Sequence, residues 1–295
     1  MTPKQFKTYY WLVNTIKNSD GITLEEINRR WQENELISDG ISMNRRTFIR
    51  YRNNIESLWG IDISVQPHSR YKYYIRNPHV LEDGSIHQWM LTTLAVRHLL
   101  IDNVALHSRV VLEPVPSGEF HLVTIMEAMK ENRKILMSYR KYDDKDSKSW
   151  TLSPYCVKMY NRRWYLLGKT KKGSFCTFAL DRMEHVDVSN EGFEMDEDFS
   201  AADYFKDMYG ICRDEKAKKQ RIVIRTYGTE HHYLRDLPLH ESQREVGRGE
   251  GYVDFELRVY PTWELAGYIL SRGKRMEVIS PKSYAKELMR MKGTL

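Results

Sequence analysis

The N-terminal part of the chain carries apolar side chains at helical spacing, separated by short polar turns. A first helix is expected over 4–17, where five apolar residues recur at this spacing: Phe6, Tyr9, Tyr10, Val13 and Ile16. Thr23, with Glu26 three residues later, has the spacing of a capping box and predicts the start of a second helix. Asn44 is a good N-cap for a third helix, which is expected to end at Trp59-Gly60. Two strand-like runs, 61–65 and 71–75, then predict a hairpin.

The periodic pattern is weaker over residues 79–120. Apolar residues between Ile86 and Leu100 predict one or two helices, and Pro114, Pro116 and Gly118 interrupt the chain afterwards. Two interpretations stay open for this segment. It links two domains or pairs two chains, or it forms a helical hairpin that packs on its own neighbours.

The hydrophobic period changes from helical to alternating after residue 133. A helix is expected over 121–133, followed by four strands over 135–142, 150–159, 163–169 and 175–183. Short strands that are closed by tight turns at this spacing predict a small β-barrel.

The C-terminal third repeats strands and helices in the order β-α-β-β-α-β-α, which predicts a ferredoxin-like α+β sandwich. The expected elements are a strand over 221–226, a helix over 229–234, a hairpin over 241–247 and 252–260, a helix over 262–270, a strand over 275–279 and a helix over 283–291. The fold class is therefore α+β and multidomain. The expected domains are 1–78, a helical linker over 79–120, the barrel over 121–192, and a C-terminal extension over 193–295.

Composition excludes several classes of protein and permits a polyanionic partner. The chain has 295 residues, and its formal net charge is +6. No apolar run approaches the length of a membrane-spanning helix, and the N-terminus lacks the apolar core of a secretory signal. Three cysteines without CxxC spacing predict neither a disulfide framework nor a zinc knuckle, so a reducing cytoplasm is the expected compartment.

The third expected helix carries four arginines in its first two turns and no acid among them. Arginines at a helix N-terminus oppose the macrodipole, and a partner that carries phosphates would offset this cost. Three helices followed by a hairpin with a basic tip is the order of a winged helix-turn-helix, in which the third helix enters the major groove. The alternative is a solvated basic face. The candidate DNA-binding residues are Arg45, Arg46, Thr47, Arg50, Tyr51, Arg52, Arg70 and Lys72.

The stretch Asn44-Arg45-Arg46-Thr47-Phe48, with Arg50, resembles the recognition helix of DeoR-like bacterial regulators. A second resemblance lies in the barrel region, where Arg163-Trp164-Tyr165-Leu166 is similar to the triplet that gives the WYL domain its name. Three further pieces match in order: Ser138-Tyr139-Arg140, Ser153-Pro154-Tyr155 and 178–183. This resemblance implies an Sm-like, SH3-type barrel that senses nucleic-acid-like or other anionic ligands.

Arginines and tyrosines from several strands of this barrel suit a phosphate-bearing ligand. The guanidinium group is a rigid fork that matches phosphate oxygens, and tyrosine rings offer stacking faces for bases. The candidate ligand-binding residues are Ser138, Tyr139, Arg140, Tyr155, Lys158, Arg163, Tyr165 and Arg182. Trp164 and Leu166 are expected in the core instead, and an alternative for Arg182 is an ion pair with Asp181 or another acid. The chain departs from the family pattern at Cys156 and Ala179, which leaves the ligand class open.

The sequence contains no catalytic or cofactor motif. The adjacent His231 and His232 cannot chelate one ion well, so they do not predict a metal site. We therefore expect no enzyme activity, no metal and no cofactor. The expected function is that of a bacterial transcription regulator, a homodimer that binds double-stranded DNA and senses a nucleotide or oligonucleotide. Two alternatives remain. One is an accessory protein that binds single-stranded nucleic acid in phage defence or nucleic-acid processing. The other is an adaptor whose basic helix binds an acidic protein.

Overall fold

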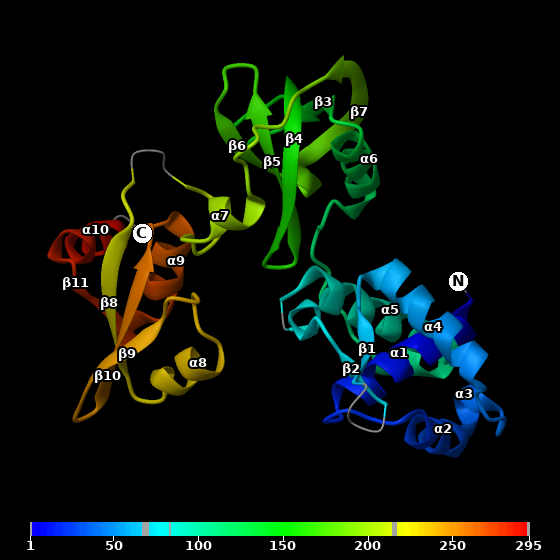
Figure 1. Cartoon of the computed structure of the whole chain (residues 1–295). Coiled ribbons are helices and arrows are strands. Elements are labelled where there is room, and N and C mark those ends of the chain that lie inside the picture. Colours follow the sequence, from blue (N-terminus) through cyan, green and yellow to red (C-terminus); the bar gives the residue numbers. More distant parts are fainter. Residues whose placement is uncertain (1, 67–70, 83, 214–216, 294–295) are drawn as a thin grey trace. The chain divides into compact units, whose positions relative to one another are not determined.

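The computed structural model describes residues 2–66, 71–82, 84–213 and 217–293 (Figure 1). The chain divides into two compact units, one over Met1–Glu113 and one over Pro114–Leu295. Within the described residues, no helix is both long enough and apolar enough to cross a membrane.

The N-terminal unit is built from helices and one hairpin. Its first elements are α1 (Pro3–Lys17), α2 (Leu24–Glu33), α3 (Glu35–Ser38), α4 (Arg45–Trp59), β1 (Ile63–Gln66) and β2 (Lys72–Ile75). Thr23 caps α2 by accepting the backbone N–H of Glu26. Gly60 ends α4 in the left-handed conformation, with φ of 62°. The helices and the hairpin that the sequence predicts here are confirmed, with one further short helix, α3.

The rest of this unit is η1 (Pro78–Leu81), α5 (Ile86–Asp102) and η2 (Val104–Arg109). One side of α5 packs on the N-terminal core through Leu91 and Ala95, and His98 stacks on Phe6. The parts of the expected linker that form η1 and α5 therefore pack on the core of the N-terminal unit.

The second unit begins with α6 (Glu119–Lys130) and a five-stranded antiparallel sheet. Its strands are β3 (Arg133–Tyr139), β4 (Lys148–Tyr160), β5 (Arg163–Thr170), β6 (Phe175–Ala179) and β7 (Met183–Gly192), in the order β6-β5-β4-β3-β7. Trp164 and Leu166 lie in the core beneath α6, as the sequence predicts.

The expected closed barrel is not confirmed, because the sheet is open between its edge strands. β6 and β7 are consecutive in the chain, and η3 (Leu180–Arg182) joins them. Among the described residues no ladder of hydrogen bonds pairs these two strands. The edge near η3 is fixed instead by a backbone bond from Arg140 N–H to the Arg182 carbonyl, at 3.3 Å.

The turn η3 also meets the start of α6. Gly118 precedes α6 with φ of 65°, and a Cβ atom at this position would lie 2.4 Å from backbone atoms of Leu180 and Asp181. A glycine is therefore required where the chain begins α6.

The remaining elements form a four-stranded antiparallel sheet with helices. They are α7 (Ala201–Phe205), β8 (Gln220–Tyr227), α8 (Glu230–Asp236), β9 (Arg244–Gly249), β10 (Tyr252–Val259), α9 (Trp263–Ser271), η4 (Gly273–Arg275), β11 (Met276–Ser280) and α10 (Lys282–Lys292). The strand order is β11-β8-β10-β9. From β8 onward the elements follow the β-α-β-β-α-β-α order that the sequence predicts. The core lies on one face of this sheet, against α8, α9 and α10.

Candidate functional site

The candidate functional residues lie mainly in two regions. The first region is the start of α4. Phe48, Ile55 and Trp59 are buried and fix the inner face of this helix. Asn44 accepts the backbone N–H of Thr47 at 2.8 Å and caps it. The opposite face is therefore held toward solvent by the packing of the inner one.

Arg45, Arg46 and Arg50 are exposed on α4, and Arg52 is half-buried. Arg46 and Arg50 are four residues apart and so share one side of the helix. Arg50 places its guanidinium 5.5 Å from the ring of Tyr51. Among the residues that the structure describes, no carboxylate forms an ion pair with these four arginines. Their positive charge is therefore available to an outside partner.

The other candidate DNA-binding residues differ in their surroundings. Tyr51 packs inward, with its ring edge-on to Tyr9 at 5.3 Å. Lys72 lies half-buried on β2, over Gly21, where a Cβ atom would come within 3.3 Å of its side chain. Arg70 lies outside the described residues.

The second region is a pocket of about 460 Å³ in the second unit. The five-stranded sheet, the turn after β3 and a segment near residue 212 line it: Tyr139, Lys141, Tyr142, Asp143, Trp150, Phe175, Cys176, Thr177, Phe178, Arg182, Tyr204, Cys212 and Arg213. Aromatic rings and cations dominate this lining.

Arg182 lies over two aromatic rings of the pocket, those of Tyr139 and Tyr142. Its guanidinium lies 3.7 Å from the ring of Tyr142 and 5.0 Å from that of Tyr139. Its Nε and Nη2 donate to the backbone carbonyl of Arg140 at 3.1 and 2.8 Å. Tyr139 is buried edge-on to Phe178, and this burial raises the pKa of its phenol. Stacking and two hydrogen bonds therefore fix the position of Arg182, which leaves its other donors for a ligand.

The charges around the pocket favour an anion. Lys141, Arg182 and Arg213 line it, whereas Asp143 is its one acid among the described residues. Lys141 lies 6.0 Å from the ring of Trp150. Arginine beside stacking rings is the combination that binds phosphates and bases together. The pocket can therefore hold a nucleotide-like ligand.

A second hollow, of about 350 Å³, adjoins the pocket and shares Lys141, Tyr142 and Arg182 with it. Arg140 lines this hollow with a side chain that is 60% exposed, and its Nε lies 3.8 Å from Glu184. Arg140 and Arg182, two of the candidate ligand-binding residues, therefore meet at one place.

The other candidates on the sheet do not line the pocket. Arg163 Nη2 donates to Asp181 at 2.7 Å, and this hydrogen bond raises the pKa of Arg163. Asp181 therefore pairs with Arg163 and not with Arg182. Tyr165 lies 5.6 Å from the Arg163 guanidinium, and burial raises the pKa of its phenol. Ser138 is half-buried on β3.

Tyr155 and Lys158 belong to a different part of β4. Tyr155 is buried among aromatic rings, edge-on to Phe175 at 4.9 Å and to Phe199 at 4.8 Å. Lys158 Nζ donates to the Gly210 carbonyl at 2.7 Å, and burial lowers the pKa of its amine. In the structure both side chains join the sheet to the segment that follows it.

The far wall of the pocket is held by Glu264 on α9. Its Oε1 accepts the backbone N–H groups of Ile211 at 3.1 Å and Cys212 at 3.0 Å. From the sheet, Thr177 Oγ1 donates to the Ile211 carbonyl at 3.2 Å. The segment that carries Cys212 is therefore fixed on two sides.

Of the residues that line the pocket, only Tyr139 and Arg182 belonged to the sequence-based selection; those it missed include Lys141, Tyr142, Trp150, Cys212 and Arg213. For Tyr142 the signal was present, because it lies two residues after Arg140, where a charged turn begins. Cys212 and Arg213 come from a separate segment, and no local pattern places them beside the sheet.

The residues described by the structure contain no group of three or more His, Cys, Asp or Glu side chains that could hold a metal ion. His231 and His232 lie with their rings 4.1 Å apart on α8.

Comparison with known proteins identifies two domains in the second unit. Residues 121–188 match the WYL domain, and residues 218–292 match the WCX domain. No curated protein matches the chain.

Two solved structures match the chain. Proteasome accessory factor B/C (PafBC) of Arthrobacter aurescens is 16% identical, with a TM-score of 0.39, over 98% of this chain. The chain spans 46% of the length of that protein. A CRISPR Cas-related protein is 12% identical, with a TM-score of 0.41. The match covers 99% of this chain and 83% of the length of that protein. From the two domain matches, the protein carries a WYL domain followed by a WCX domain.

Proposed function

We propose that the protein is a DNA-binding transcription regulator that acts by binding and not by catalysis. In this proposal α1, α2, α4 and the β1–β2 hairpin form a winged helix-turn-helix of the DeoR-like kind, and α4 enters the major groove. The observation that carries it is the set of exposed arginines at the start of α4, which have no acidic partner among the described residues. Phosphates would neutralise them and release counterions.

Duplex binding tests this proposal directly. We would measure binding of the full chain to its own upstream region and to a scrambled duplex over a salt series. Selective binding that weakens steeply with salt is the expected result. In R46A/R50A we expect a loss of about 10-fold or more in affinity, because two phosphate or base contacts disappear. Arg97→Ala is the matched control, since Arg97 is an exposed arginine on α5. If the double variant binds as tightly as R97A, α4 is not the recognition helix.

We further propose that the pocket around Arg182 binds the effector, a nucleotide or an oligonucleotide. The stacking of Arg182 on Tyr142 at 3.7 Å supports this, since it presents a cation and a ring to one ligand. Arg182→Gln should weaken binding of such a ligand by about 10- to 100-fold, because a charge-assisted hydrogen bond is removed. Arg162→Gln, an exposed change on the β4–β5 turn, is the control. Equal affinities for the two variants would exclude Arg182 from the site.

A regulator of this kind is proposed to act as a homodimer. Two copies of α4 would then contact half-sites about 34 Å apart, one helical turn of DNA. Sedimentation of the protein with and without its operator measures the stoichiometry. A single chain bound per operator would contradict the dimer.

A further inference from the structure

Charged side chains are arranged on the outward face of the C-terminal sheet, opposite the face that packs against the core. Residues of β8 and β10 lie directly opposite one another across the antiparallel ladder, as three outward-facing pairs show: Tyr227 with Tyr252, Arg225 with Asp254, and Arg221 with Arg258. The first pair is aromatic and the second is an ion pair. The third brings two like charges together, which is unfavourable in a sheet unless something compensates for it.

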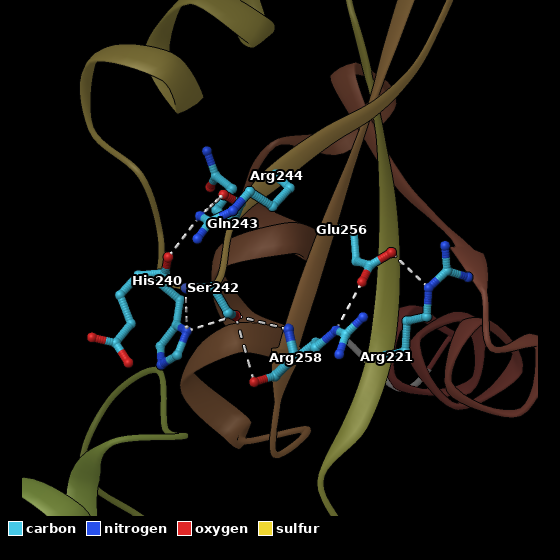
Figure 2. Close-up of polar contacts among 8 residues, drawn as sticks. Arg221, His240, Ser242, Gln243, Arg244, Glu256 and Arg258 are labelled. Atoms are coloured by element: carbon cyan, nitrogen blue, oxygen red, sulfur yellow. Dashed lines mark hydrogen bonds and ion pairs between the residues drawn. The ribbon is translucent and has the colours of Figure 1, made fainter.

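Glu256 supplies the compensation within the protein. Its two carboxylate oxygens accept Nε of Arg221 at 2.6 Å and Nε of Arg258 at 3.0 Å (Figure 2). The Glu256 side chain is 11% exposed, whereas the two arginines are 58% and 67% exposed. Hydrogen bonds with both arginines lower the pKa of Glu256, so it stays ionised at neutral pH. One shielded carboxylate therefore orients two solvent-facing guanidinium groups.

Arg221 and Arg258 keep hydrogen-bond donors that their ion pairs with Glu256 do not use. Each guanidinium has five N–H donors and uses only Nε here, so the Nη groups of Arg221 and Arg258 have no acceptor among the described residues. Arg225, on the same face, differs. It donates Nε and Nη2 to Asp254 at 2.7 and 2.8 Å and stacks on Tyr252 at 3.7 Å. The sheet therefore contains one arginine that is held by a two-point ion pair and two that are held through Nε alone.

A third arginine adds to the positive charge. Arg244 on β9 lies directly opposite Glu256 on the other side of β10, and its Nη1 donates to the carbonyls of Glu241 and Gln243. Arg244 is thus the cross-strand neighbour of Glu256, but its guanidinium is held by backbone carbonyls and not by this carboxylate. Figure 2 shows the three arginines and Glu256 on β8, β9 and β10.

We propose that Arg221 and Arg258 bind one phosphate group on the outward face of the C-terminal sheet, with Glu256 as a positioning residue for both. The remaining Nη donors match phosphate oxygens, and the fork geometry suits two-point contacts. The phosphate belongs to a nucleic-acid strand or to a mononucleotide. This site is separate from the pocket around Arg182, and the proposal does not rest on the function proposed above.

Equilibrium binding of three probes to the full chain tests the proposal: inorganic phosphate, 5′-AMP and fluorescein-labelled dT12. In R221Q/R258Q we expect affinity for at least one probe to fall about tenfold, as the loss of a charge-assisted contact implies. If dT12 is the bound form, the slope of log K against log salt should shrink by about 0.7, the value for one phosphate of a single strand. A loss confined to dT12 identifies a strand as the source. A loss shared by 5′-AMP or phosphate identifies a terminal or free phosphate.

Arg248→Gln is the matched control, because Arg248 on β9 is 66% exposed and pairs with Glu245. Removing its charge should leave all three affinities unchanged. R221K/R258K keeps both charges but loses the forks, and we expect an intermediate loss. The proposal is overturned if the double glutamine variant binds every probe like R248Q, or if the lysine variant matches the wild type. Repeating the series in R182Q separates the two sites, since a failure of the pocket proposal would leave these differences in place.

Discussion

The most informative single perturbation is the removal of the Glu264 carboxylate. Glu264 lies in the first turn of α9 and accepts two backbone N–H groups from the segment that forms the far wall of the pocket. It does not line the pocket itself. The change Glu264→Ala should therefore loosen residues 209–213 without removing any group that a ligand would touch.

The size of the effect follows from the two bonds. A hydrogen bond to a charged group contributes about 1.5–3 kcal/mol, and we take the lower value because the two N–H groups share one acceptor oxygen, Oε1. Two such bonds give about 3 kcal/mol, which is about a 100-fold change in the equilibrium for opening the segment. Glu264→Gln keeps an acceptor oxygen but not the charge, so about half of this effect should remain.

Hydrogen exchange at backbone amides measures this local opening. Exchange of the Ile211 and Cys212 amides should be about 100-fold faster in E264A than in the wild type. Nucleotide binding at the pocket should weaken in the same variant. Glu241→Ala is the control, because Glu241 is exposed in the same domain and loses the same charge. Unchanged exchange at Ile211 and Cys212 in E264A would refute the reasoning.

Three further results are expected. Gly118→Ala should lower the free energy of unfolding by about 3 kcal/mol in denaturant titrations, since it adds left-handed strain and a backbone overlap. The control Gly173→Ala has open space around the new methyl group, so its free energy of unfolding should fall by only about 1 kcal/mol. Desolvation raises the pKa of Cys212 to about 11, so its alkylation rate should rise about tenfold per pH unit between pH 8 and 10, and a plateau below pH 9.5 would contradict this. Asp181→Asn should destabilise the WYL domain by about 2 kcal/mol, because Arg163 is only 25% exposed and loses its partner; an unchanged unfolding midpoint would show that the pair contributes nothing.

The elements of this fold were largely predictable because their signals are local. Thr23 and Asn44 cap the helices that the sequence assigns to them. The alternation around Trp164 and Leu166 placed both side chains in the core. Whether the strands close into a barrel was not predictable in this way, because closure depends on the pairing of β6 with β7 and no local pattern encodes it.

The candidate pocket was predictable only in part, and for the same reason. Tyr139 and Arg182 belong to the motif pieces that resemble the WYL domain, and both line the pocket. Tyr155 was selected for its ring, but that ring packs against Phe199, which follows the sheet in the chain. Arg163 was selected for its charge, but Asp181 pairs with it across the sheet. Which partner a side chain finds is decided by contacts between distant segments.

The close approach at Gly118 has a consequence for signalling. The backbone that begins α6 and the turn that carries Arg182 leave no room for even one methyl group between them. Packed segments of this kind move together, because close-packed interiors transmit displacement. If an effector draws Arg182 toward it, the start of α6 is displaced with the turn, so the same movement reaches the residues where the chain enters the second unit. Under the proposed function, the contact at Gly118 would therefore couple the position of Arg182 to the start of α6.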